Sequence, residues 1–279
     1  MTTAPACPIG KLEKLLLATD MSDYSEGAIR EAITFAAKCS SRLVACMTLE
    51  TNPEFETIGS NVFEKEEAEA TAHLEAIKAR AAKQNVLCET VLRESTDAAE
   101  AFVGEAVEKK VDMIVIGRRG RKGVAKALMG ETAAKVIAHA PCKVLIVPRA
   151  AQIEYRNILV ATDASAHATA AVTEAIAIAK RCGSHLIALS AMRDEGERAD
   201  AGKHASAAAE AARREGVSAE AVTPTGRSFT AIVETASGRG VDLIVMGTYG
   251  KTGIKKLLMG SSTEKVIGSA GCAVLVVKA

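Results

Sequence analysis

Short apolar runs alternate with longer, Ala-rich polar stretches along the second part of the chain. The runs have strand length and no polar alternation, which is typical of strands buried on both faces of a sheet. The pattern predicts strands at 157–162, 185–192, 217–223, 241–246 and 273–278, with helices at 166–182, 197–215, 228–237 and 261–269. The first part follows the same order, so we expect an α/β fold of two Rossmann-like or flavodoxin-like domains. Each should be a five-stranded parallel sheet with helices on both faces.

The two parts repeat one motif order. DMIVIG begins at Asp112 and DLIVMG at Asp242, 130 residues later. Near the start of each part, LLLATD ends at Asp20 and ILVATD at Asp163, 143 residues apart. The first part therefore carries 13 additional residues, which we place around 51–62.

The repeat also sets the expected domains. We place the first at 1–149 and the second at 153–279, with the boundary within 148–154. The last strands, 144–147 and 274–277, are short and very apolar, so we expect them at sheet edges, where strands tend to pair.

Polar and glycine residues gather where the strands of the second domain end. Asp163 follows the first strand, Gly247 follows the fourth, and Gly250 lies three residues further on. Open parallel sheets bind ligands beyond the carboxyl ends of their strands. The glycines would let the backbone turn tightly and approach a ligand. Asp163 would accept hydrogen bonds from ribose hydroxyls or hold a metal through water.

A predicted helix start completes this set. Gly260 precedes Ser261, Ser262 and Thr263, and Ser261 with Glu264 fits a capping box. The first N–H groups of a helix and its dipole favour a phosphate, and the three hydroxyls would add donors. Turn glycines and a cap could explain each part alone, but the whole set predicts a phosphate-bearing ligand.

These residues resemble the universal stress protein family in its tandem, two-domain form. ATP-binding members carry G-x2-G-x9-G-S/T after the fourth strand. Gly247, Gly250, Gly260 and Ser261 match this spacing without a gap, and Asp163 matches the acid after the first strand.

The resemblance implies further properties. It places Ala191 or Met192, together with Met246, beside the adenine of ATP, which would bind with or without Mg²⁺. It implies a cytoplasmic regulator of the stress response, and an internal pseudo-dimer of the two halves joined through their last strands. It also implies a homodimer and a protein partner that the sequence does not identify.

The first domain departs from the pattern at one position. Its corresponding residues are Asp20, Gly117, Gly120, Gly130, Glu131 and Thr132. Glu131 stands where the second domain has Ser261, beside a basic loop of Arg118, Arg119, Arg121, Lys122 and Lys126. In the favoured interpretation Glu131 pairs with this loop and fills a degenerate site, which leaves one ATP per chain. In the other, the basic residues still hold an anion.

Composition excludes several classes of partner. A net charge of +1, 3% aromatic residues and no Trp argue against nucleic-acid binding. No apolar run reaches the ~18 residues of a membrane span, and MTTAPACPIGKLEK lacks the apolar stretch of a signal peptide. Seven unclustered cysteines favour reduced thiols in the cytosol.

Catalytic motifs are not evident. The five histidines show no metal-ligand spacing, and no nucleophile–base pair can be placed, so we expect no metal site and a regulatory binding module. Two alternatives stay open: a slow ATPase or nucleotidyl-transfer enzyme on the same fold, and a nucleotide-free scaffold.

Overall fold

The computed structural model describes residues 7–51, 60–120, 129–249 and 259–279. The strands of the first half are β1 (Lys14–Thr19), β2 (Arg42–Glu50), β3 (Cys88–Ser95), β4 (Met113–Gly117) and β5 (Lys143–Val147). Its helices are η1 (Asp23–Ser25), α1 (Glu26–Cys39), α2 (Ser60–Ala82), α3 (Ala98–Lys109) and α4 (Glu131–His139). Most of the predicted insertion at 51–62 lies outside the described residues.

The second half has the predicted order of elements. Its strands are β6 (Asn157–Ala161), β7 (His185–Leu189), β8 (Ala219–Val222), β9 (Leu243–Gly247) and β10 (Ala273–Val277). Its helices are α5 (Ala166–Cys182), η3 (Glu195–Glu197), α6 (Arg198–Arg214), α7 (Ser228–Gly238) and α8 (Ser261–Ser269). β7 ends at Leu189, before the predicted residue 192, and beyond it Met192 forms an isolated bridge with Thr225.

All ten strands form one sheet, in the order β3-β2-β1-β4-β5-β10-β9-β6-β7-β8. Strands within each half are parallel, whereas β5 and β10 pair antiparallel, with Leu145 opposite Leu275. This pairing confirms the internal pseudo-dimer. Each last strand lies at the edge of its own half's part of the sheet, as expected, and the pairing of the two joins the halves into one sheet whose outer edges are β3 and β8.

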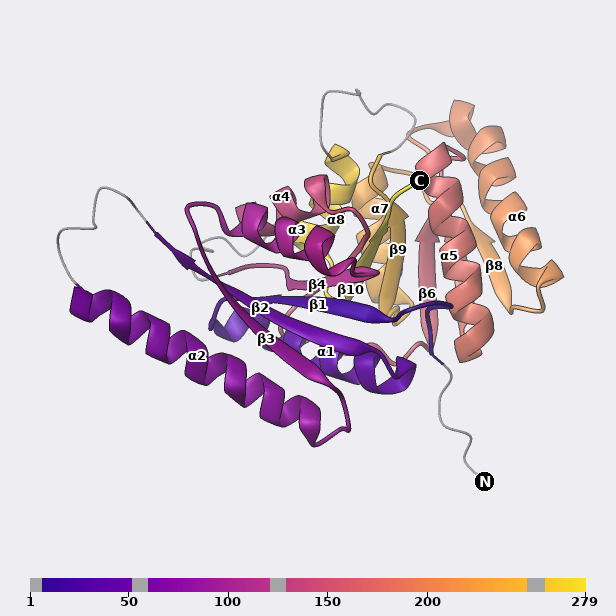
Figure 1. The fold of residues 1–279 in the computed structure, drawn as a ribbon. Helices are drawn as coiled ribbons and strands as arrows, with labels where there is room; N and C mark the ends of the chain where they lie inside the picture. The colour runs from indigo at the N-terminus through magenta and orange to yellow at the C-terminus, as the bar shows by residue number, and fades with distance from the viewer. Residues whose placement is uncertain (1–6, 52–59, 121–128, 250–258) are drawn as a thin grey trace.

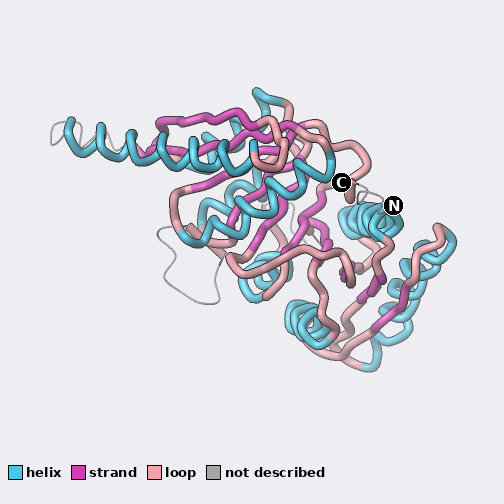
Figure 2. Tube along the Cα trace, turned by 90° about the horizontal axis from the view of Figure 1, so that it is seen from below, coloured by secondary structure: helices cyan, strands magenta, loops and turns pink. Residues whose placement is uncertain are grey.

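Helices cover both faces of the sheet (Figure 1). Side chains alternate between the faces, so Leu15 and Leu17 join one buried cluster and Leu16 the other. The first cluster includes residues of α1, α2, α5 and α6, and the second includes residues of α3, α4, α7 and α8. Each cluster therefore runs through both halves. Seen from below, some helices run across the view and others are seen end on, as expected for a twisted sheet (Figure 2).

One disulfide differs from the expectation of reduced thiols. Cys7 and Cys39 are bonded, with their Cα atoms 4.5 Å apart. Their 32-residue separation in the sequence gave no sign of this contact. Only the path of the amino-terminal segment brings Cys7 to the end of α1. Cys46, Cys88, Cys142, Cys182 and Cys272 are free thiols.

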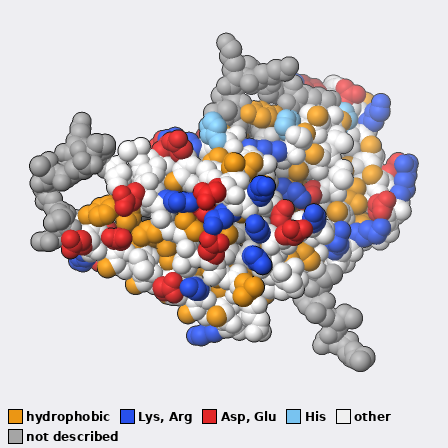
Figure 3. All heavy atoms as spheres, in the orientation of Figure 1, with side chains coloured by type: hydrophobic (Ala, Val, Ile, Leu, Met, Phe, Trp, Pro, Cys, Tyr) orange, Lys and Arg blue, Asp and Glu red, His pale blue; other side chains and the backbone are white. Residues whose placement is uncertain are grey.

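The surface and the helices bear on possible partners. Lys and Arg side chains are interspersed with Asp and Glu over the face drawn in Figure 3. No helix in the described ranges is both long enough and apolar enough to cross a membrane.

Candidate functional site

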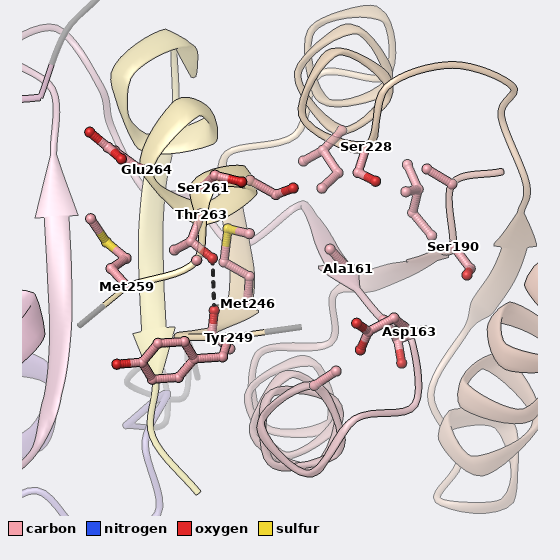
Figure 4. Close-up of a pocket in the computed structure, with 18 residues that line it drawn as sticks. Ala161, Asp163, Ser190, Ser228, Met246, Tyr249, Met259, Ser261, Thr263 and Glu264 are labelled. Atoms are coloured by element: carbon pink, nitrogen blue, oxygen red, sulfur yellow. Dashed lines mark hydrogen bonds between the residues drawn. The ribbon is translucent and has the colours of Figure 1, made fainter. Parts of the chain in front are cut away.

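A cavity of about 420 Å³ opens in the second half, where β6, β7 and β9 end and α7 and α8 begin. The predicted residues that line it are Asp163, Ala191, Met246, Gly247, Gly260, Ser261, Ser262 and Thr263. The structure thus brings together side chains from elements far apart in the sequence (Figure 4). The predicted Gly250 lies outside the described residues. Met192 is not in the lining: it is 2% exposed, and its N–H donates to Pro224 O.

Asp163 is positioned by a tight turn after β6. Ala164 has a left-handed backbone, with φ of 59°. Its N–H donates to Thr162 Oγ1 at 3.2 Å, and the Ser165 N–H donates to Asp163 Oδ1 at 3.0 Å. In Figure 4 Asp163 lies across the cavity from Ser261. The two residues therefore belong to opposite walls of the cavity.

The start of α8 forms another wall. Gly260 is the N-cap residue and no side chain caps the helix, so the predicted capping box is wrong, because Ser261 is already the first helical residue. The first-turn N–H groups are thus left without a side-chain acceptor, which suits an anion. Thr263 differs from its expected role, since its buried hydroxyl donates to Gly247 O at 3.0 Å and ties α8 to β9.

The glycine at the end of β9 has a packing role. A Cβ on Gly247 would lie 2.7 Å from backbone and side-chain carbons of His167, at the start of α5. We predicted that this glycine allows close approach of a ligand, but helix packing alone already requires it. Gly260 N donates to Thr248 O at 2.8 Å and fixes the entry to α8.

The remaining walls contain residues that the sequence analysis missed. Ser190 follows β7 and Ser228 begins α7, and both side chains line the cavity with Ile232, Tyr249 and Met259. The sequence positions of these residues relative to the glycine motif did not reveal their role. Only the folded sheet and its helices bring the end of β7 and the start of α7 to the site.

The charged groups of the described lining are the carboxylates of Asp163 and Glu264. Across the described ranges, no three His, Cys, Asp or Glu side chains group as metal ligands.

The corresponding region of the first half has the same turn around Asp20, with Met21 at a φ of 61° where the second half has Ala164. Asp20 Oδ1 accepts hydrogen bonds from the N–H and the hydroxyl of Ser22, at 3.1 and 2.7 Å. A Cβ on Gly120 would lie 2.5 Å from Asp20 Oδ2, so the glycine loop lies directly against this carboxylate. Gly117 packs beside Tyr24 O, while Gly130 caps α4 and precedes Glu131 and Thr132.

Glu131 does not fill the first site as expected. Its side chain is 81% exposed and pairs with Lys135 Nζ at 2.8 Å, since both residues lie on one face of α4. Arg118 instead donates to Ala270 O of the second half, at 2.6 Å. Arg121, Lys122 and Lys126 lie outside the described residues.

A histidine of α2 reaches the first site without having been predicted there. His73 Nε2 lies 3.2 Å from Thr19 Oγ1, at the end of β1. Burial lowers the pKa of His73, and the nearby Asp20 carboxylate offsets part of this effect. Nothing in the sequence indicated that His73 reaches this site, because the insertion hid how α2 aligns with the repeat.

Comparisons with known proteins agree with this architecture. A model of the universal stress protein family matches residues 11–148 and again 154–278. A universal stress protein of Thermus aquaticus is 34% identical over 134 residues, which is 48% of this chain and 96% of the relative. A solved universal stress protein from Archaeoglobus fulgidus is similar over 96% of this chain and 99% of its own, with a TM-score of 0.76 at 20% identity.

Proposed function

Because the chain belongs to the universal stress protein family, we propose that it is a cytoplasmic stress-response regulator that binds one ATP in its second half. The observation that carries the proposal is the 420 Å³ cavity, which joins Asp163 and the uncapped start of α8. Its volume falls within the range of small-molecule sites.

The walls suit the three parts of a nucleotide. The apolar side chains of Ala191, Ile232 and Met246 would pack against the adenine. The Asp163 carboxylate would accept hydrogen bonds from the ribose hydroxyls. The N–H groups at the start of α8, with the Ser261 hydroxyl, would hold the phosphates.

The charge of the lining favours a nucleotide that arrives with a cation. Asp163 and Glu264 are acidic, and no Lys or Arg side chain belongs to the described lining. A bound Mg²⁺ would offset the repulsion between these carboxylates and a triphosphate. We therefore expect ATP affinity to rise when Mg²⁺ is added.

The first half is proposed to lack this site because its Gly120 lies against the Asp20 carboxylate. The counterpart of Gly120 in the second half, Gly250, lies outside the described residues. The ribose would have to displace the glycine loop, and that displacement would lower affinity. This closure replaces the Glu131 carboxylate as the reason for asymmetry, because Glu131 is exposed and paired with Lys135.

Calorimetry with ATP tests the proposal. The unmodified chain should bind one equivalent, and Ser261→Glu should weaken binding, because it removes a hydroxyl and adds a negative charge at the start of α8. The loss should stay below the roughly 4 kcal/mol of two unit charges about 4 Å apart at an effective dielectric near 20, since the new carboxylate would pair with Lys265 as Glu131 pairs with Lys135. Ser237→Glu, which adds the same charge to an exposed residue near the end of α7, is the matched control. Two equal sites would refute the asymmetry, and unchanged binding by Ser261→Glu would place ATP elsewhere.

Turnover separates a regulator from the rival slow ATPase or nucleotidyl-transfer enzyme. His167, the nearest described imidazole to the glycine motif, contacts Thr248 Oγ1 and the Ala279 N–H through Nδ1. It is not part of the described cavity lining. Steady-state phosphate release above about one per second would favour the enzyme. No binding of ATP in equilibrium dialysis would favour the scaffold.

We also propose that 1–149 and 153–279 are separate folding units and that the whole chain forms a homodimer. Since β5 and β10 pair within one chain, two chains would associate through other surfaces. Light scattering should find a dimer of the whole chain. An isolated 153–279 fragment should pair through its exposed β10, and a strictly monomeric fragment would contradict this edge pairing.

A further inference from the structure

A second cavity of about 420 Å³ lies in the first half, at the opposite end of the strands. It is formed where β1, β2 and β3 begin, together with the end of α3. Its lining includes Lys14, Arg42, Lys109 and a single carboxylate, Glu89. Because it lies far along the strands from the motif residues, it does not depend on the proposed nucleotide site.

The cations of this cavity are incompletely neutralised. Lys109 Nζ pairs with Glu89 Oε1 at 2.6 Å, and Lys14 Nζ donates to Lys109 O at 3.0 Å. No carboxylate in the described part of the chain pairs with Arg42. Two of the three cations thus lack an acidic partner, which favours an anion carrying two charges.

The lining is also apolar on one side. Val44 is buried at 3% exposure, and Leu87 is exposed over 72% of its surface. An exposed leucine beside unpaired cations suits a ligand that combines a charged head with an apolar group.

The second half provides an internal comparison, because strand register identifies the matching residues. Lys14 lies opposite Arg42, and Asn157 opposite His185. The Leu87 carbonyl accepts from Leu43 N, as the Ser218 carbonyl accepts from Leu186 N. His185 therefore replaces Arg42, and Ser218 replaces Leu87.

In the second half these replacements close the site from within. His185 contacts Ser218 Oγ at 2.9 Å and Glu220 Oε1 at 3.4 Å, and Arg239 pairs with the same Glu220 carboxylate. Asn157 Nδ2 donates to Arg239 O at 3.0 Å, as Lys14 does to Lys109 O. The two halves thus share this strand register and the contact to the Lys109 or Arg239 carbonyl. Of the two, only the first half leaves a guanidinium, that of Arg42, without a carboxylate partner among the described residues and an apolar side chain, that of Leu87, exposed.

We propose that this cavity of the first half binds a small phosphate monoester with an apolar substituent. Arg42 would grip two phosphate oxygens with its planar guanidinium, and Lys14 would use a remaining N–H on the same group. Leu87 and Val44 would pack against the substituent. The site is separate from the one that holds ATP.

Nuclear magnetic resonance with phenyl phosphate tests this on the whole, isotope-labelled chain. The amides of Leu87 and Cys88 should shift saturably in the millimolar range, while the matching Ser218 and Ala219 should not. Inorganic phosphate should bind more weakly, and phenol should not bind. Higher salt should weaken binding.

A variant that copies the second half provides the matched control. Arg42→His with Leu87→Ser should weaken binding about tenfold to a hundredfold, the effect of losing a charge-assisted hydrogen bond. Both side chains are exposed, so folding should be retained, as a melting temperature would verify. Ser261→Glu should leave these shifts unchanged. The proposal is overturned if Leu87 and Cys88 do not shift, if the double variant binds equally, or if phenol gives the same shifts.

Discussion

Lys143 Nζ, on β5 of the first half, lies 2.7 Å from Glu174 Oε1, on α5 of the second half. The Glu174 side chain is 17% exposed, so this ion pair is partly shielded from water. The corresponding carboxylate of the first half, Glu31, pairs with its neighbour Arg30 instead. The equivalent glutamates of the two halves thus pair with different cations: Glu174 with a lysine of the other half, and Glu31 with an arginine of its own helix.

The first prediction concerns this pair. Lys143→Met should destabilise the chain by about 1–3 kcal/mol, because Glu174 would keep a mostly buried charge without a partner. Lys180→Met, which removes an ion pair to Glu215 between well-exposed side chains, should change stability by less than about 0.5 kcal/mol. Denaturant unfolding measures both, and equal losses would contradict the argument.

The second prediction concerns Glu131. Since its carboxylate is exposed and paired with Lys135, Glu131→Ser should leave the stoichiometry near one ATP per chain. Calorimetry decides the point. A rise toward two sites would show that the charge of Glu131, and not the contact of Gly120 with Asp20, closes the first half.

Two glycines should respond to alanine in opposite directions. Gly247→Ala would press a Cβ into the His167 backbone and should cost about 1–3 kcal/mol. Gly104 lies in α3 with open space around it, so Gly104→Ala should stabilise by about 0.5–1 kcal/mol. Thermal unfolding compares the two. A neutral Gly247→Ala would mean that α5 can move away from β9.

The turn after β6 gives a fourth prediction. Ala164 has positive φ, so Ala164→Gly should relieve backbone strain and stabilise by up to about 1 kcal/mol. The control Ala207→Gly, at an exposed position inside α6, should lose about 0.5–1 kcal/mol. If both substitutions destabilise equally, the left-handed turn is not strained.

The fifth prediction concerns pH. Burial holds the pKa of His73 below its ordinary 6.5, although Asp20 and Glu26 oppose this shift and Arg80 adds to it. The unfolded chain therefore takes up the proton first, and stability should fall as the pH drops through 6.5. The loss ends once the pH has passed below the folded-state pKa.

Comparison with His73→Gln isolates this contribution. Burial raises the pKa of the Glu31 and Asp242 carboxyls, so these groups favour the folded state on acidification and mask the effect in a single curve. The free energy of unfolding of the unmodified chain, minus that of His73→Gln, should decrease as the pH falls from about 8 to 5, the range in which histidine titrates. A constant difference would contradict the assignment.

Much of the fold was predictable because it depends on local patterns. The bounds of α5 and α8 agree with the sequence pattern, and strands such as β9 and β10 shift by only one or two residues. Apolar runs of strand length can be buried on both faces only in a covered parallel sheet. Eight of the predicted second-half site residues line the cavity, since each lies at or just after the end of a strand, or in or just before the first turn of a helix.

Only the tertiary structure decided contacts between distant segments. The roles of Thr263 and Gly247 as packing residues, the Cys7–Cys39 bond and the exposure of Glu131 all depend on which elements meet. The same is true of the first-half cavity, whose residues come from three strands and a helix. Sequence periodicity determines which face of an element is buried, but the partner of a side chain is fixed only when those faces pack together.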